Sequence, residues 1–296
     1  MRSSEARGDR LSIVICTYDR QLRLLETLKA IDDLGYIEKH DVVVVENTDD
    51  EAKRRATVAL CRARFPKLKV VESAVAGASR ARNIGLEEAE CEIVACLDDD
   101  ASPERGWAEA ILERRFDDEI VYGGGPIDPQ WEVAPPAWLP EELLGAFSAL
   151  DLGEASRVLR KGEFVYGANM FFRTQALKSI GGFDESLGRV RNNLQSEEEI
   201  AVQRRLAAVG RGFYVANARV RHFVPASRLN WLWLLRRSSW QGFSEIAQTG
   251  RLEEWHRAAL AEGNSNESLR RLVDELTATP HSKQDRAPGR GVAAAV

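Results

Sequence analysis

The sequence predicts an α/β protein with a doubly wound, mostly parallel β-sheet flanked by helices, and with a helical extension at the C-terminal end. Two observations in the first hundred residues support this prediction. Short runs rich in β-branched residues are nearly continuously apolar, which is typical of strands covered on both faces. These runs alternate with segments of helical spacing, and that alternation indicates parallel strands joined by right-handed crossovers.

The N-terminal part of the chain contains four predicted strands and three predicted helices. The strands are expected at residues 11–16, 41–46, 68–72 and 92–97. The helices are expected between them, at residues 21–34, 51–65 and 79–89. In the first helix, Leu24, Leu28 and Ile31 line one face, as expected of a helix that packs on a sheet.

The pattern changes after residue 101. Glycines at 123–125, followed by five prolines between residues 126 and 140, indicate a loop-rich stretch. Beyond it we expect a strand, a helix and two further strands, at residues 163–173, 197–209, 213–216 and 219–223. Residues 229–260 have helical spacing and are rich in tryptophan. This second half is therefore expected to add strands and to end in a helical extension.

Composition limits the classes of protein that fit this chain. With 44% hydrophobic and 29% charged residues, the 296-residue chain is globular rather than disordered or fibrous. The net charge of −5 argues against a general nucleic-acid binder. No apolar run approaches the roughly 18 residues needed to cross a bilayer, and the N-terminus lacks the apolar core of a secretory signal. We therefore expect a soluble, cytoplasmic protein with no nucleic-acid partner.

Polar side chains follow three of the predicted strands at the point where each strand ends. These residues are Thr17, Tyr18 and Arg20 after the first strand, Glu46 at the end of the second, and Asp98, Asp99 and Asp100 after the fourth. Ligands of open parallel sheets bind beyond the carboxyl ends of the strands, so we expect these clusters to meet there. Several carboxylates at one edge repel one another unless a cation lies among them.

The three consecutive aspartates are the strongest of these signals. Asp98 and Asp100 project to the same side if the extended conformation persists, and together they could ligate one divalent ion whose other ligands are phosphate oxygens. The alternative is that the acids cap a helix that starts near Pro103. Because Ser102 and Pro103 already supply an N-cap and a first-turn proline, we favour metal binding.

Two further features carry weaker signals. Glu46 could accept the imide N–H of a pyrimidine base, but it could equally be an exposed acid at the start of a loop. Residues 77–83 combine small residues with Arg80 and Arg82 at a helix start, which can offer backbone N–H groups and a guanidinium to phosphate. A solvated helix face is the alternative for this segment.

Taken together, these motifs resemble the family 2 glycosyltransferases, which have the GT-A fold. The similar pieces stand in the family's order and cover most of residues 11–228: SIVICTYDR, VVVVENTDD, AGASRARNIGLEEA, IVACLDDDASP, GANMFFRTQALKSIGGFDESLG, SEEEIAVQRRLAAVG and VRHFVPASR. The resemblance implies transfer of a sugar from a nucleotide-sugar, with Mn²⁺ or Mg²⁺ and with inversion at the anomeric carbon. We expect the donor to be a UDP-sugar.

On the donor side, the resemblance assigns a role to each polar cluster. Thr17, Tyr18 and Arg20 match the loop that holds the nucleotide. Glu46 stands where the family usually has an aspartate facing the base, and Arg82 matches the family's diphosphate-side arginine. The metal and ribose carboxylates of the DXD motif are matched by Asp98 and Asp100, with Asp99 between them.

On the acceptor side, Glu198 and Glu199 align with the family's acidic pair, whose second member is the usual catalytic base. A carboxylate is needed there because the acceptor hydroxyl must lose its proton as it attacks the anomeric carbon. Ser196 and Glu199 also form a capping box, so the local sequence leaves a structural role for Glu199 open, and Glu198 is the alternative base. His222 stands where the family often completes its metal site, although a lone histidine is more often structural.

We therefore expect a metal-dependent, inverting glycosyltransferase in which Glu199 is the base and Asp100, Asp98 and His222 hold the metal. The expected segments are a disordered N-terminus (1–10), a nucleotide-sugar-binding half (11–101), an acceptor-binding and catalytic half (102–228), a C-terminal helical extension (229–279) and a disordered tail (280–296). Acceptor recognition is expected at residues 123–160 and in the C-terminal helices. The acceptor and the oligomeric state are not predicted.

Three alternatives stay open. A sugar nucleotidyltransferase should carry a glycine-rich, basic loop after the first strand, where this chain has Thr17-Tyr18-Asp19-Arg20. A non-catalytic nucleotide-sugar-binding protein on the same fold would have no need of the acids at 98–100 and 198–199. The basic, Trp-rich helix could make peripheral contact with a membrane instead of serving only as core.

Overall fold

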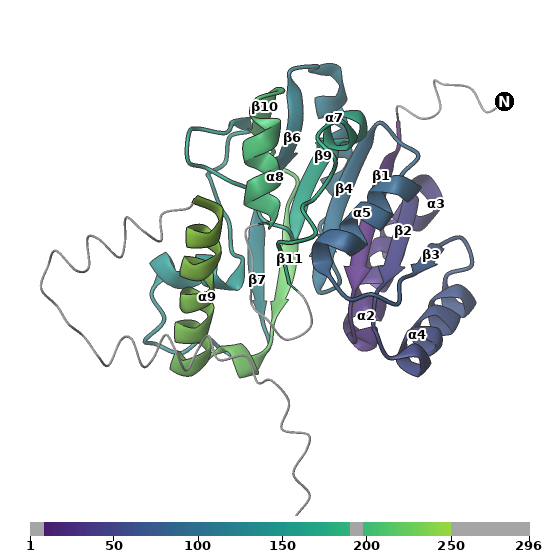
Figure 1. Cartoon of the computed structure of the whole chain (residues 1–296), viewed down its shortest axis with the longest axis horizontal. Helices are drawn as coiled ribbons and strands as arrows, with labels where there is room; N and C mark the ends of the chain where they lie inside the picture. The colour runs from purple at the N-terminus through teal and green to yellow at the C-terminus, as the bar shows by residue number, and fades with distance from the viewer. Residues whose placement is uncertain (1–8, 190–197, 250–296) are drawn as a thin grey trace, which may run out of the picture. The chain divides into compact units, whose positions relative to one another are not determined.

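The structure of the chain, a computed structural model, describes residues 9–189 and 198–249 (Figure 1). The chain divides after Gln248 into two compact units, and nearly all described residues lie in the first. The predicted disordered tail (280–296), Ser196 and the end of the predicted 229–260 helix lie outside the described residues, as does nearly all of the predicted disordered N-terminus. The boundaries expected at 101 and 228 stay predictions.

An eight-stranded sheet forms the centre of the first unit, in the order β3-β2-β1-β4-β9-β6-β10-β8. Six of its strands run in one direction: β1 (Leu11–Thr17), β2 (Asp41–Glu46), β3 (Lys69–Glu72), β4 (Ile93–Asp98), β6 (Ile120–Gly124) and β10 (Arg211–Tyr214). Two are antiparallel to them: β8 (Arg157–Val158) and β9 (Asn169–Arg173). The predicted α/β class with a mostly parallel sheet is confirmed.

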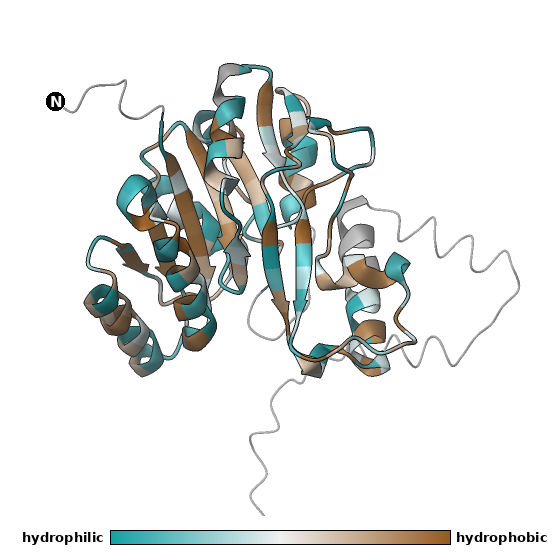
Figure 2. Ribbon diagram, turned by 180° about the vertical axis from the view of Figure 1, so that it is seen from behind, coloured by the Kyte–Doolittle hydropathy of each residue, from teal (hydrophilic) through white to brown (hydrophobic). Residues whose placement is uncertain are grey.

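Helices flank this sheet and bury its apolar residues (Figures 1 and 2). The described α-helices are α2 (Gln21–Asp33), α3 (Tyr36–Lys39), α4 (Glu51–Arg64), α5 (Ala78–Glu88), α6 (Trp107–Leu112), α7 (Thr174–Ser179), α8 (Glu198–Leu206) and α9 (Trp231–Thr249). Short 3₁₀ turns stand at η1 (Glu113–Phe116), η2 (Glu141–Phe147) and η3 (Ala226–Arg228). Helix α5 packs so closely on β1 that a Cβ at Gly85 would lie 2.2 Å from Val14 Cγ1. This close approach fixes how α5 presents its side chains to the carboxyl end of β1.

A second sheet, in the order β5-β11-β7, corrects one prediction. Residues 101–103 form β5 (Ala101–Pro103), which pairs antiparallel with β11 (Val220–Val224), and β11 pairs parallel with β7 (Ile127–Trp131). The predicted helix start at Pro103 is therefore wrong. Helix α6 begins at Trp107, after Gly106, whose backbone φ of 87° lies in the left-handed region. Ser102 pairs with Arg221 of β11, so pairing with a distant strand overrides the local Ser-Pro signal for a helix.

The loop-rich interpretation of residues 123–125 is also wrong for its first two glycines. Gly123 and Gly124 end the buried strand β6. A Cβ at Gly123 would lie 2.3 Å from the carbonyl oxygen of Phe213 and 2.5 Å from the Phe171 ring. These glycines therefore mark close packing of neighbouring strands rather than a turn.

None of the helices among the described residues is both long and apolar enough to cross a bilayer. The predicted cytoplasmic location stays a prediction.

Candidate active site

A cavity of about 490 Å³ lies at the carboxyl ends of β1 and β4. Eight of the predicted site residues line it: Thr17, Tyr18, Arg20, Arg82, Asp98, Asp99, Glu198 and Glu199. Its wall also includes parts of η2, residues 166–168 and two residues of α9. Segments from both halves of the chain therefore meet at the edge of the sheet where the sequence predicts a ligand site.

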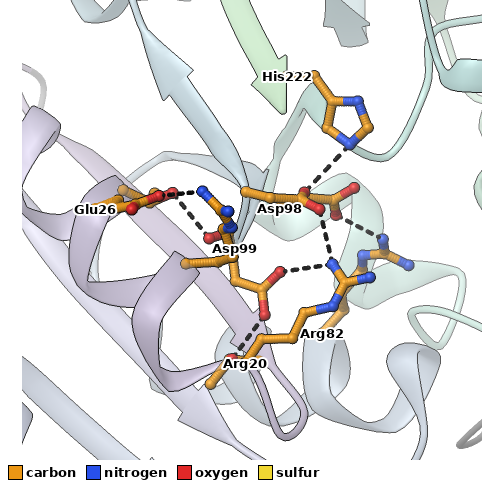
Figure 3. Close-up of polar contacts among 10 residues, drawn as sticks. Arg20, Glu26, Arg82, Asp98, Asp99 and His222 are labelled. Atoms are coloured by element: carbon orange, nitrogen blue, oxygen red, sulfur yellow. Dashed lines mark hydrogen bonds and ion pairs between the residues drawn. The ribbon is translucent and has the colours of Figure 1, made fainter. Parts of the chain in front are cut away.

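The turn after β4 is held in place by donors from the first strand and the loop after it. Thr17 Oγ1 donates to Asp99 Oδ2 at 2.7 Å. Arg20 Nη1 donates to Asp99 Oδ1 at 3.2 Å (Figure 3). It also donates to Asp100 Oδ2 at 2.7 Å. Thr17 and Arg20 therefore stabilise the aspartate turn itself, and Asp99 is occupied by protein donors.

The pairing of β5 with β11 brings His222 to this turn, because His222 lies opposite Ala101 in the register. His222 Nε2 is 3.2 Å from Asp100 Oδ1. Ligand atoms of Asp98, Asp100 and His222 all lie within 4.8 Å of one another. The structure thus brings together the three residues that the sequence predicts as metal ligands.

The chemistry of this trio fits a divalent cation. Asp100 and His222 are buried, and Asp100 Oδ1 and His222 Nδ1 have no hydrogen-bond partner among the described residues. Buried polar atoms without partners are costly, and carboxylate oxygens are preferred ligands of Mg²⁺ and Mn²⁺, with imidazole as an additional donor. Burial alone would raise the pKa of Asp100, but the neighbouring His222 and Arg20 hold that pKa below its usual range.

On the other side of the cavity, α5 presents Arg82 to the start of α8. Arg82 Nη1 donates to Glu198 Oε1 at 2.7 Å, and Arg82 Nη2 lies 3.5 Å from Asp98 Oδ1. Burial favours the neutral acid at Glu198, but the Arg82 charge outweighs it and lowers the pKa of Glu198. Burial, and then the adjacent Glu198, raise the pKa of Glu199 well above that of an ordinary glutamate. The two neighbouring carboxyls therefore differ in character: Glu198 is paired with Arg82 and favours the ionised form, whereas Glu199 keeps its proton to higher pH.

Glu46 is placed differently from the other predicted residues. It is 1% exposed and is absent from the described wall of the cavity. Its Oε1 accepts the Thr48 backbone N–H at 2.8 Å, while its Oε2 is buried without a hydrogen-bond partner among the described residues. The next residue, Asn47, does line the cavity and donates from Nδ2 to the Gly77 carbonyl oxygen at 3.0 Å. Asn47 Oδ1 is buried with no partner among the described residues, which makes Asn47 a candidate ligand contact that the sequence did not indicate.

Several arginines near the cavity were also missed from the sequence. Arg189 and Arg237 line its wall. Burial lowers the pKa of Arg228 to about 10. The charge of Asp100 opposes this shift, and the charges of Arg20 and Arg189 add to it, so Arg228 lies close to all three groups. Cations beside an acidic metal site are suited to a diphosphate. Arg228 stands six residues after His222 in the VRHFVPASR motif, which was the available sequence signal.

The tryptophan-rich region forms a small core of its own. Trp138 stacks on Trp231 at a centroid distance of 4.1 Å, and Phe147 stacks on Trp233 at 5.0 Å. Leu234 of α9 is buried with them. The same helix contributes Arg237 and Ser238 to the cavity wall, so this core positions α9 against the site.

Comparisons with known proteins agree with this geometry. The sequence profile of Glycosyl transferase family 2 matches residues 12–181. Glucosyl-dolichyl phosphate glucuronosyltransferase of Haloferax volcanii is 29% identical over 80% of this chain and 76% of its own length. Succinoglycan biosynthesis protein ExoM of Rhizobium meliloti is 27% identical over 77% of this chain and 71% of its own length.

Solved structures share the fold. A mannosyltransferase, PcManGT from Pyrobaculum calidifontis, in complex with GDP-Man and Mn²⁺, matches with a TM-score of 0.58 at 20% identity, over 82% of this chain and 64% of its own. TarS 1-349 of S. aureus in complex with UDP-GlcNAc matches with a TM-score of 0.53 at 15% identity, over 73% of this chain and 58% of its own. This chain thus spans less than two thirds of either structure, and the likeness confirms the predicted GT-A fold. Since the family profile also matches more than half of the sequence, the chain belongs to glycosyl transferase family 2.

Proposed function

We propose that this glycosyltransferase moves the sugar of a nucleotide-diphosphate sugar to an acceptor hydroxyl with inversion, assisted by Mn²⁺ or Mg²⁺. The observation that carries the proposal is the arrangement of two acidic groups in one site. Asp98 and Asp100 lie with His222 at the end of β4, while Glu198 and Glu199 begin α8, and Arg82 contacts both groups. A metal-bound diphosphate and an acceptor base are the two requirements of the reaction.

In the proposed reaction, Glu199 accepts the proton of the acceptor hydroxyl as its oxygen bonds to the anomeric carbon. The bond from that carbon to the donor phosphate oxygen breaks on the opposite face, and the nucleoside diphosphate leaves as an anion. A cation held by Asp98, Asp100 and His222 would supply charge stabilisation for this leaving group. Arg228 and Arg189 would add positive charge near the diphosphate.

The donor is proposed to be a UDP-sugar. The structural neighbours bind either GDP-Man or UDP-GlcNAc, so a GDP-sugar is the alternative. Thr17 and Tyr18, together with Asn47, are proposed to hold the nucleoside, because all three line the cavity. Glu46 was expected to face the base, but it does not line the cavity as Asn47 does, so Asn47 is the better-placed contact.

A peripheral membrane contact through α9 is also proposed. Trp231, Leu232 and Leu235 are 52%, 77% and 63% exposed and share one side of the helix, with Arg236 also exposed. The Haloferax relative is named for a dolichyl phosphate compound, which supports a lipid-linked acceptor. Co-sedimentation with phosphatidylglycerol vesicles tests this proposal, and a Leu232→Asp/Leu235→Asp variant should lose the binding without losing donor binding.

A ligand screen followed by a product assay tests the proposed activity. UDP-sugars and GDP-mannose should raise the Tm in the presence of Mn²⁺ and much less with EDTA, because a ligand that binds only the folded state stabilises it by mass action. The stabilising donor should then release nucleoside diphosphate. Release of pyrophosphate from a nucleoside triphosphate would instead indicate a nucleotidyltransferase, and stabilisation without any turnover would indicate a binding protein.

A further inference from the structure

Arg82 is the residue that links the two acidic groups of the site. Its guanidinium lies 2.7 Å from Glu198 and 3.5 Å from Asp98, and its side chain is 9% exposed. The Glu198 side chain is 7% exposed, so this is a buried ion pair between α5 and α8. Nη1 of Arg82 is therefore engaged by Glu198, and its Nη2 faces the carboxylate of Asp98.

The space around this ion pair is tightly fitted. A Cβ at Gly167 would lie 2.8 Å from Arg82 Nη2. On the other side, a Cβ at Gly188 would lie 3.2 Å from Glu198 Cδ, and the Phe183 ring lies 5.6 Å from Arg82 Cζ. Glycines at 167 and 188 therefore leave room for the two charged groups where a larger residue would press against them.

Arg80, on the same helix, is a surface arginine with which Arg82 can be compared. It is about half exposed and bonds to Glu185 at 3.2 Å. Exposed pairs of this kind contribute little to stability. Unlike Arg80, Arg82 is buried, has two carboxylate partners and lines the cavity. Arg82 therefore does not lie on a solvated helix face.

The ion pair also determines which of the two adjacent glutamates is available for proton transfer. Arg82 engages Oε1 of Glu198, and no arginine bond of this kind is made by Glu199, although Oε2 of both glutamates is buried without a hydrogen-bond partner among the described residues. Burial and the Glu198 charge raise the pKa of Glu199, which agrees with the geometry. A fixed anion at position 198 thus makes its neighbour the stronger base.

We propose that Arg82 is a positioning residue, which holds Glu198 as a buried anion beside Asp98 and thereby sets Glu199 as the base that faces the acceptor. This inference rests on the proposed function, and it replaces the expectation that Arg82 binds the diphosphate. Arg82 then influences proton transfer without contacting either substrate. The test must therefore separate effects on donor binding from effects on turnover.

A double-mutant cycle on thermal unfolding tests the ion pair without any substrate. Arg82→Gln and Glu198→Gln each leave a buried charge without its main partner, so each should lower the Tm by on the order of 10 °C. The Arg82→Gln/Glu198→Gln variant leaves two neutral amides and should lose much less than the sum. Additive losses would overturn the proposal, and this readout stays valid even if no sugar donor is ever found.

Binding and turnover test the positioning role. In Arg82→Gln, the Kd for UDP in saturating Mn²⁺ should change by less than about threefold, while kcat with the donor found by screening should fall on the order of 100-fold. Gly167→Ala should produce a smaller kcat loss of the same kind, because it displaces the guanidinium without removing its charge. The matched control, Arg80→Gln, should leave both constants unchanged.

The opposite pattern would overturn the proposal. If Arg82 binds the diphosphate, Arg82→Gln should weaken UDP binding tenfold or more, and Glu198→Gln should leave UDP binding unchanged. The positioning role further predicts that Arg82→Gln shifts the rising limb of the pH–rate profile, whereas loss of a diphosphate contact weakens UDP binding and slows turnover without moving that limb. Failure of the wild-type enzyme to release nucleoside diphosphate would contradict the proposed function but not the coupled unfolding of Arg82 and Glu198.

Discussion

His222 Nε2 lies 3.2 Å from Asp100 Oδ1, although neither residue's own segment indicates the contact. Strand β11 carries the histidine and β5 follows the aspartate directly, and pairing of these two strands brings the side chains together. Asp100 Oδ1 and His222 Nδ1 have no hydrogen-bond partners among the described residues. The contact therefore agrees with the proposed metal site, which includes both residues.

Replacing these residues should remove cation dependence. In Asp100→Ala, Mn²⁺ should no longer enhance the stabilisation of the protein by UDP, and turnover should fall roughly 100-fold or more, since the metal supplies several kcal/mol of charge stabilisation. His222→Ala should also weaken Mn²⁺ binding. Calorimetric titration with Mn²⁺ and UDP measures both effects. Asp118→Ala, which alters a fully exposed acid, is the control, and an Asp100→Ala enzyme with parental turnover would refute the metal site.

Acid should weaken the fold through His40, which is buried beside β1. Leu11 N–H donates to His40 Nδ1 at 3.3 Å, and burial lowers the pKa of His40 to about 4. Because the unfolded chain binds a proton near pH 6.5 and the folded chain does not, the free energy of unfolding falls as the pH drops from 6.5 towards 4. The His40 contribution lost by pH 5 should be about 2 kcal/mol.

Urea unfolding at pH 7 and pH 5 measures this loss. His40→Asn keeps an acceptor for Leu11 but cannot take up a proton near these pH values. Its stability should therefore fall by about 2 kcal/mol less than that of the wild type between the two pH values. Equal losses in both proteins would show that other groups are responsible.

The parts of the fold that follow from local patterns could be predicted from the sequence. Continuous apolar runs such as that ending at Thr17 identify strands covered on both faces, and parallel strands bring their polar ends to one edge. The pairing of β5 with β11 joins distant segments, and the local Ser102-Pro103 signal indicated a helix instead. Likewise, no pattern near Arg82 shows that its partner is Glu198, because only the approach of α5 to α8 makes that contact. Sequence indicated which residues matter, while the tertiary contacts determine what each one touches.

Glu199 is predicted to act in the chemical step and not in donor binding. Glu199→Gln should bind UDP with Mn²⁺ as the parent does, while kcat falls by roughly 10²- to 10⁴-fold because an amide cannot accept the acceptor proton. Equilibrium titration and steady-state kinetics separate the two effects. Glu87→Gln, at an exposed position of α5, serves as the control. If Glu199→Gln turned over normally, Glu198 or a purely structural Glu199 would be the better assignment.

The pH dependence of turnover should show the environment of Glu199. Burial and the neighbouring Glu198 raise its pKa, so Glu199 still holds a proton at pH values where an ordinary glutamate is ionised. Only the deprotonated form can accept the acceptor proton, and kcat/KM should therefore rise with pH, with its limb well above the range near 4 to 5 of free glutamate. The measurement is kcat/KM from pH 5 to 9 at saturating Mn²⁺. Glu199→Asp, whose shorter arm changes the contact with Glu198, should move this limb, whereas the control Glu87→Gln should not. A profile already flat from pH 5 upward would mean that the group accepting the proton has an ordinary pKa, and that Glu199 is not that group.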